Sequence, residues 1–236
     1  MALGTKLGGC GTVEPEAGQR PAGSGSGTRA RLEVAAVVAT GGLHLVCTEI
    51  FHTNGLFILV AMVAWGTYVA MCFRKDRTVI KLWGFSKDNL GPTASASSIV
   101  ASLAILAMAI LASHRGSLSF HWHMVPLLLL YPVWGITQQF LILAVAARNL
   151  DRLGGGLQPP GLRYWIVSII SGVLFGIVHL PNVMLMAGTF LMGLVFTPLY
   201  LKWRNLWPLG IYHGWLGVFA YFWLFNRDPL VGLFGP

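Results

Sequence analysis

Long apolar runs constrain this chain more than any other feature of its sequence. Several stretches after residue 32 approach the roughly 20 apolar residues that a helix needs to cross a bilayer. Only 10% of the 236 residues are Asp, Glu, Lys or Arg, against about 25% in a typical soluble domain. A surface so poor in charge is expected to face lipid. The sequence therefore predicts an all-α fold, a polytopic bundle of transmembrane helices.

About seven spans are expected, with the N-terminus inside. In that orientation every Lys and Arg except Arg115 and Arg227 lies in or beside a cytoplasmic segment, as the positive-inside rule requires. The basic loop between the second and third spans is expected to hold a short interfacial helix whose Trp83 and Phe85 face lipid. We expect a multi-pass integral membrane protein of the cell (inner) membrane. The expected spans are residues 32–51, 54–73, 95–113, 124–147, 163–181, 184–202 and 206–225.

The chain divides into a tail and one membrane domain. Residues 1–28 are rich in Gly, Ser and Pro and are expected to be disordered. Residues 29–236 form the helical domain, with a core at about 95–225. The loop charges account for the net charge of +8, so we expect the lipid bilayer, and no nucleic acid, as a partner. Three cysteines without a CxxC predict neither a disulfide framework nor a thiolate metal site. The oligomeric state stays open.

Polar side chains inside apolar segments mark the candidate site, because such groups tend to face a bundle interior or a wet cavity. Two adjacent amides, Gln138 and Gln139, interrupt the fourth span. Trp134 and Gln138 are four residues apart and share a helix face, whereas Gln139 points about 100° away. Histidines lie in the fifth and seventh spans, at His179 and His213. The alternative is a purely structural role, in which these groups only form hydrogen bonds between helices.

Their sequence neighbours add detail. Phe175 is four residues before His179, so its ring can pack against the imidazole. Asn182 follows Pro181 and is a suitable N-cap for the next helix. Of the acidic residues, only Glu49 is expected within the membrane. With His44 and His52 it forms no helical ligand set, so an interfacial turn is expected there rather than a metal site.

Glycine pairs occur at helix-packing spacing. Gly172 and Gly176 form one GxxxG motif, and Gly210 and Gly214 form another. Such pairs allow two helix backbones to approach closely. The fifth and seventh helices, which carry the two histidines, are therefore expected to pack tightly against neighbours.

Three segments together resemble the CAAX proteases and bacteriocin-processing enzymes, the glutamic-type intramembrane proteases that include type II CAAX prenyl endopeptidases. The family pattern is EExxxR, then FxxxH, then HxxxN. Here "FGIVHLPN" matches the second motif, "NLWPLGIYHGWLG" resembles the third, and "GITQQFLIL" stands where the first belongs. The resemblance covers residues from about 75 to 236. Gln138 and Gln139 replace the two glutamates, Leu143 the arginine and Gly217 the asparagine.

The resemblance implies intramembrane hydrolysis of a peptide bond in a membrane-embedded or lipidated substrate. No cofactor is expected, and no metal either, because a zinc site needs three protein ligands and only two histidines can be placed together. The resemblance implies catalytic positions at Gln138, His179 and His213. A neutral His179 could activate water in place of the missing carboxylate, with Gln138 orienting the water and His213 stabilising an oxyanion. The remaining candidates are expected to line the site: Gln139, Phe175, Asn182 and Trp134.

Two other functions stay open at this point. Loss of both glutamates and the arginine is also what a catalytically inactive relative would show, one that uses the same cavity to bind membrane segments. A histidine-dependent transporter or cofactor-binding protein is a further alternative from another class. Counted from the basic ends of the helices, His179 is expected deeper in the membrane than Gln138 and His213. A shared cavity therefore requires tilted or shifted helices.

Overall fold

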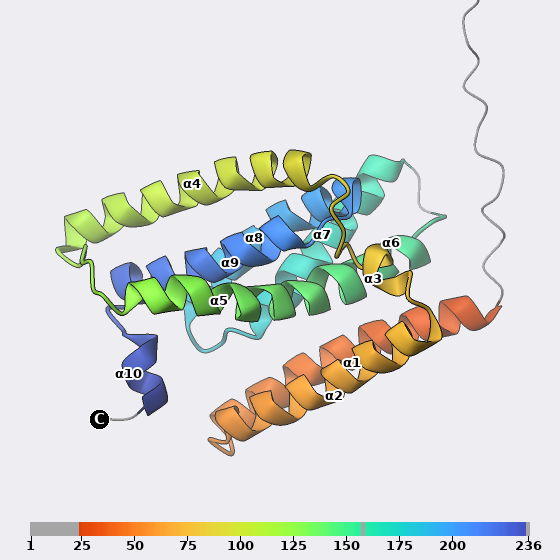
Figure 1. The fold of residues 1–236 in the computed structure, drawn as a ribbon, viewed down its shortest axis with the longest axis horizontal. Coiled ribbons are helices and arrows are strands. Elements are labelled where there is room, and N and C mark those ends of the chain that lie inside the picture. Colours follow the sequence, from red (N-terminus) through yellow and green to blue (C-terminus); the bar gives the residue numbers. More distant parts are fainter. Residues whose placement is uncertain (1–23, 157–158, 235–236) are drawn as a thin grey trace, which may run out of the picture.

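The computed structural model describes residues 24–156 and 159–234, and within these ranges every regular element is a helix (Figure 1). The all-α prediction is confirmed. Most of the expected tail lies outside the described residues, but α1 already begins at Ser24, eight residues before the expected first span. The elements are α1 (Ser24–Glu49), α2 (Asn54–Lys75), α3 (Val79–Leu82), α4 (Leu90–Arg115), α5 (Met124–Gln139), the π-helix η1 (Phe140–Ala147), α6 (Arg148–Leu153), α7 (Pro160–Ile177), α8 (Val183–Trp203), α9 (Trp207–Phe219), the π-helix η2 (Ala220–Leu224) and α10 (Pro229–Phe234).

Six helices of the described chain are long and apolar enough to cross a membrane. The seventh expected span, 206–225, is present as α9 and η2 but does not belong to this set. Its position explains the difference, because α9 packs against both α4 and α5 and buries residues such as Leu209, His213 and Val218. A helix surrounded by other helices can carry Gly, Trp and His instead of lipid-facing aliphatic residues. The six spans are Gly27–Glu49, Gly55–Lys75, Leu90–Arg115, Met124–Leu153, Pro160–Ile177 and Val183–Trp203.

Glycines set the closest helix contacts, as their spacing predicted. A Cβ on Gly135 of α5 would lie 2.3 Å from the Gly210 carbonyl oxygen, and one on Gly214 would lie 2.5 Å from the backbone nitrogen of Pro132. A Cβ on Gly172 of α7 would similarly lie 2.9 Å from the carbonyl oxygen of Phe190 in α8. Backbone cannot yield as a flexible side chain can, so α5 with α9 and α7 with α8 form two tight pairs that define the core.

The α1–α2 hairpin lies beside this core and is fastened to it near one end. Glu33 of α1 accepts hydrogen bonds from Arg29 (2.7 Å), from the Tyr68 hydroxyl (2.5 Å) and from Asn149 of α6 (2.6 Å). Glu33 lies within a candidate span with its side chain only 12% exposed. The candidate span Gly27–Glu49 thus includes Glu33 as well as Glu49, whereas the sequence led us to expect only Glu49 within the membrane. Three hydrogen-bond donors satisfy the Glu33 carboxylate where water is scarce.

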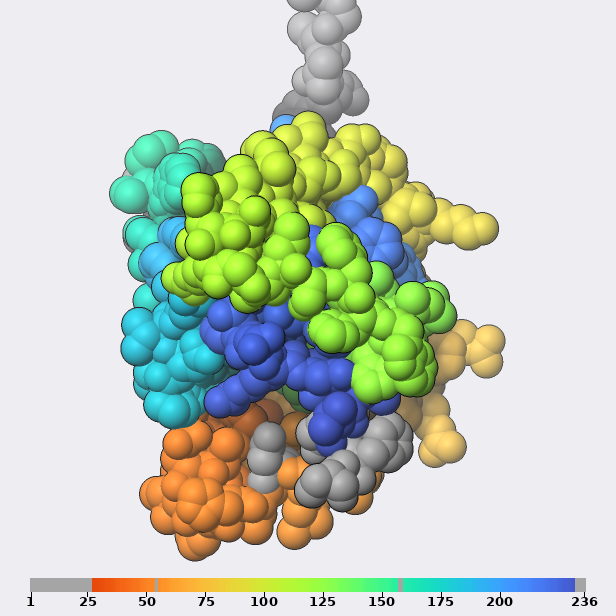
Figure 2. Space-filling view, turned by 90° about the vertical axis from the view of Figure 1, so that its left-hand side faces the viewer, coloured from red at the N-terminus to blue at the C-terminus, as the bar shows by residue number. Residues whose placement is uncertain are grey.

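Away from that anchor, the hairpin and the core diverge. Figure 1 shows α1 and α2 approaching the other helices near α3 and α6 and separating from them toward the α1–α2 turn. Figure 2 views the molecule from the turn end, where the hairpin forms the lower part of the face and the core helices the upper part. A cavity of about 380 Å³ lies between the two parts.

The loop after α2 corrects another expectation. Trp83 does not face lipid. It is 1% exposed, its ring centroid is 5.1 Å from that of Phe140, and its carbonyl accepts a hydrogen bond from the Tyr200 hydroxyl. Phe85 packs against Phe140 and Trp207. The loop folds inward because its aromatic rings find an apolar core to fill, which stabilises them more than an interfacial position would.

Candidate functional site

Two cavities meet beside α5. The hairpin cavity, of about 380 Å³, lies between the α1–α2 hairpin and α5, η1 and α7. The core cavity, of about 420 Å³, lies among α4, α5, α8 and α9. Both volumes are typical of small-ligand pockets. The residues that line both cavities define their junction: Tyr131, Trp134, Gln138, His179 and Tyr221.

His179 occupies this junction in the turn that follows α7. Its Nδ1 atom is 2.7 Å from the carbonyl oxygen of Phe175. A carbonyl can only accept a hydrogen bond, so Nδ1 carries the proton and Nε2 of the neutral ring keeps its lone pair. The ring also meets the Phe175 ring edge-on, with centroids 5.2 Å apart. The backbone of α7 thereby fixes the tautomer that can accept a proton.

His213 approaches the same place from α9. It is 7% exposed, lines the core cavity, and its Nδ1 atom is 3.3 Å from Nε2 of Gln139. The Phe175 ring lies 5.1 Å from the His213 ring as well. One phenyl ring therefore touches both imidazoles. The difference in depth expected from the sequence does not separate them.

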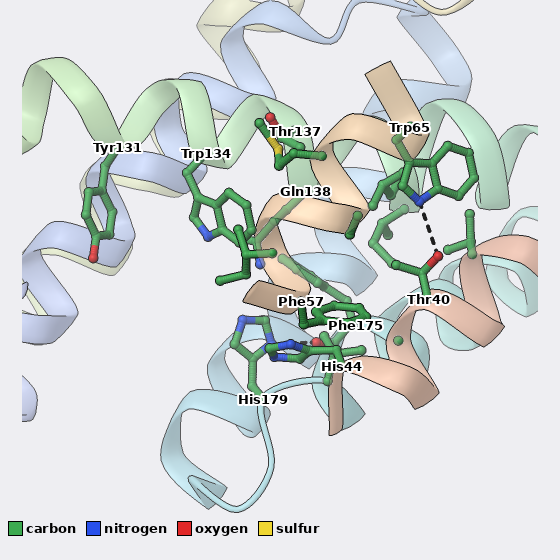
Figure 3. A pocket seen from close by; sticks show the side chains of 18 of the residues that line it. Thr40, His44, Phe57, Trp65, Tyr131, Trp134, Thr137, Gln138, Phe175 and His179 are labelled. Carbon is green, nitrogen blue, oxygen red and sulfur yellow. Dashed lines mark hydrogen bonds between the residues drawn. The ribbon is translucent and has the colours of Figure 1, made fainter. Parts of the chain in front are cut away.

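The two adjacent glutamines have different surroundings. Gln138 is partly exposed and lines both cavities, and Figure 3 shows it reaching toward His179. Gln139 is 1% exposed, lines neither cavity, and contacts His213 and the Met192 sulfur. The 100° offset between neighbouring helical positions thus assigns one amide to the cavity and the other to the support of a histidine.

Of the remaining residues that were expected to line the site, two do so and one does not. Trp134 lines both cavities, and Phe175 lines the hairpin cavity. Asn182 lines neither. Its side-chain oxygen caps α8 by accepting a hydrogen bond from the backbone nitrogen of Leu185 at 3.0 Å. Asn182 therefore belongs to the helix cap rather than to the wall of the site.

Comparison with known families bears on this arrangement. Residues 120–219 match the family model of the type II CAAX prenyl endopeptidases described as Rce1-like. Over these residues the chain is similar to that family. The resemblance drawn from the sequence is confirmed, over a matched region that runs from residue 120 instead of about 75. The chain matches no curated protein and no solved structure.

The matched region contains Gln138, Gln139, His179 and His213 but excludes α1 and α2. The matched region nevertheless does not form the hairpin cavity alone. His44 of α1 lines that cavity together with His179, and Figure 3 places the two rings close to each other. The sequence interpretation assigned His44 to an interfacial turn. A signal was available, because Gly41 and His44 are three residues apart and so share a face of α1.

The walls of the site carry no formal charge. Within the described part of the chain, neither cavity is lined by Asp, Glu, Lys or Arg. The described residues also contain no group of three or more His, Cys, Asp or Glu side chains suited to hold a metal ion. Leu143, at the position of the family arginine, is fully buried in η1 among apolar residues. The polar chemistry available at the junction is that of imidazole, carboxamide and phenol groups.

Proposed function

We propose that this protein is an intramembrane endopeptidase that hydrolyses a peptide bond with a water molecule activated by His179. One observation carries the proposal. The Phe175 carbonyl holds Nδ1–H of His179, which leaves Nε2 as a proton acceptor at the junction of two cavities. Such an acceptor is the first requirement for activating water without a carboxylate. The match of residues 120–219 to a protease family supports the same reaction class.

The reaction can be written with the groups at hand. Nε2 of His179 takes one proton from water, and the resulting hydroxide adds to the peptide carbonyl carbon. Negative charge develops on the carbonyl oxygen, and its proposed stabilisers are the Gln138 amide and the His213 ring, which both line the core cavity. Expulsion of the amine breaks the C–N bond, and a proton must reach the leaving nitrogen. The products are a carboxylic acid and an amine.

The substrate is proposed to be a membrane-embedded or lipidated peptide. Aliphatic and aromatic side chains make up most of both cavity walls, and the described chain exposes many large apolar residues toward the bilayer. An apolar substrate could leave the lipid and enter such a site with little desolvation cost. The bilayer is thus the proposed medium from which the substrate comes.

A second function, binding of membrane segments without cleavage, is favoured by the uncharged walls. A general base typically contributes about 10²–10⁴-fold to a rate, and amides at 138 and 139 cannot act as bases. A protein with this second function would bind membrane segments in the same two cavities but would not hydrolyse them.

The test uses purified protein in detergent and a panel of transmembrane and prenylated peptides. We expect slow cleavage by the wild type and its loss in His179→Ala. The control is His114→Ala, which changes an exposed histidine at the end of α4 and should cleave like the wild type. Gln138→Glu should accelerate cleavage by restoring a carboxylate. A silent wild type with an active Gln138→Glu variant would establish the second function instead, and cleavage unchanged in His179→Ala would refute the proposed site.

A further inference from the structure

His44 is the part of the site that neither the motifs nor the family match assigns. It comes from α1, 76 residues before the first position of the matched region. Its side chain nonetheless lines the hairpin cavity with Gln138 and His179, as Figure 3 shows. The two imidazoles are close enough to interact electrostatically. A second titratable ring therefore lies beside the proposed base in the same cavity.

The fold holds this ring in place through several contacts. A Cβ on Gly41 would lie 2.8 Å from a side-chain methyl of Val178, the residue before His179. Glycine at this position thus allows α1 to come close to the end of α7. His44 lies one helical turn further along the same face. Its Nδ1 atom is 3.4 Å from the Thr48 hydroxyl, and its ring is 5.5 Å from that of Phe57 in α2.

The surroundings leave His44 few competitors for proton transfer. From the elements packed around the cavity, the titratable side chains that face it are His179, Tyr131 of α5 and Tyr221 of η2. On its own helix, Glu49 interacts with it electrostatically. The α2 side chains at the cavity are uncharged: Phe57, Ile58, Ala61, Met62 and Trp65. Imidazole is the only one of the facing groups that ordinarily gains and loses a proton near neutral pH.

We propose that His44 is the general acid of the site. This inference rests on the proposed function and completes its unassigned proton step. While His179 Nε2 takes a proton from water, protonated His44 gives one to the nitrogen of the leaving amine as the C–N bond breaks. A proton then passes from His179 to His44, directly or through water, and the original state returns. The N-terminal hairpin thereby supplies a proton carrier where the family uses carboxylates.

The direct test is a pH profile of His44→Gln on any peptide that the wild type cleaves. We expect kcat to fall about 10²-fold or more, with KM little changed. The alkaline limb of the profile, where the wild type loses its acid, should disappear, whereas the acidic limb due to His179 should stay. In His44→Ala, added imidazole should restore part of kcat. The matched control is His52→Gln, an exposed histidine of the same hairpin that lines neither cavity.

A role in structure alone predicts different results. It would lower stability without changing the shape of the profile, and imidazole would not restore activity. Normal cleavage by His44→Gln, together with its loss in His179→Ala, would overturn the acid role and leave the proposed function intact. If no variant and no wild-type sample cleaves, the proposed function fails and the acid role fails with it.

A measurement on the wild type keeps the inference testable should the variants fail to fold. Nitrogen NMR of ring-labelled histidines in detergent reports the protonation of each ring. We expect a pH range in which His44 is protonated while His179 is neutral. Titration in the opposite order, with His179 holding its proton to higher pH than His44, would exclude the acid role.

Discussion

At the scale of single residues, the two adjacent glutamines have different roles although their side chains are chemically identical. Gln139 is enclosed and contacts His213, whereas Gln138 faces the cavity junction. Replacing Gln139 by Leu should therefore lower the free energy of unfolding by about 1–3 kcal/mol, because a buried ring nitrogen loses its partner. Gln138→Leu should change stability little and slow cleavage instead. Thermal unfolding in detergent measures the first effect, and equal stability losses in the two variants would contradict the division of roles.

The buried position of Leu143 suits a site that carries amides instead of carboxylates at positions 138 and 139. An arginine here would place an unpaired charge in a fully buried apolar environment. Leu143→Arg alone should destabilise the protein by about 3–5 kcal/mol. Adding Gln138→Glu and Gln139→Glu should recover part of that loss, because the charge regains partners. Yield of monodisperse protein and thermal unfolding measure both steps. If Leu143→Arg alone left the stability unchanged, the site would tolerate the arginine without the two carboxylates, contrary to this prediction.

Single residues also mark the limits of sequence reasoning. The motif positions of His179 and His213 were readable, because each imidazole stands in an apolar segment with a defined neighbour. The buried position of the Glu33 carboxylate could not be predicted from the sequence, because two of its donors, Tyr68 and Asn149, are 35 and 116 residues away. His44 was missed as a cavity residue for the same reason. Its partner His179 lies in the turn after α7, 135 residues further along the chain, and the Gly41–His44 spacing marks a shared face of α1 without showing which helix packs against it.

At the scale of elements, the α5–α9 crossing determines the geometry of the site. Gly135→Ala would place a Cβ 2.3 Å from the Gly210 carbonyl oxygen, so the helices must separate and His213 must move away from Gln139. We expect strong destabilisation and loss of cleavage. The control is Gly217→Ala, whose Cβ would meet only the Tyr131 ring, at 3.6 Å. Its effect should stay within about 0.5 kcal/mol. Normal thermal unfolding of Gly135→Ala would refute the tight crossing.

The helices themselves could be predicted from periodicity and from the length of the apolar runs. Their packing against one another could not. The spans from α2 to α8 lie close to their expected ranges because lipid demands apolar helices of a set length. The surrounded position of α9 depends on tertiary packing and was not visible in its composition. The π-helices η1 and η2 were also unforeseen. π-Helical turns often occur at functional sites, and η1 begins directly after Gln139.

At the scale of the whole molecule, basic segments far apart in sequence gather at one end. Asp151 of α6 pairs with Arg163 at the start of α7 (2.9 Å) and with Arg204 after α8 (3.1 Å). Glu33 and Asn149 tie the beginning of α1 to the same region. Opposite this end lie the α1–α2 turn and the turn that carries His179. The helices therefore separate a charged end from a weakly charged one, as the expected topology requires.

This separation predicts which end faces the cytoplasm, and single cysteines can test it. After replacement of the three native cysteines, Thr53→Cys in the α1–α2 turn should react with an impermeant maleimide on intact cells. Gly156→Cys, exposed in the α6–α7 loop, should react only after permeabilisation. Detergent-solubilised samples, in which both should react, control for accessibility. Because His44 and His179 lie toward the α1–α2 turn, the proposed substrate would reach the cavity junction from the outer half of the bilayer in this topology. The reverse labelling pattern would show that the protein has the opposite orientation in the membrane. The proposed substrate would then enter from the cytoplasmic half of the bilayer.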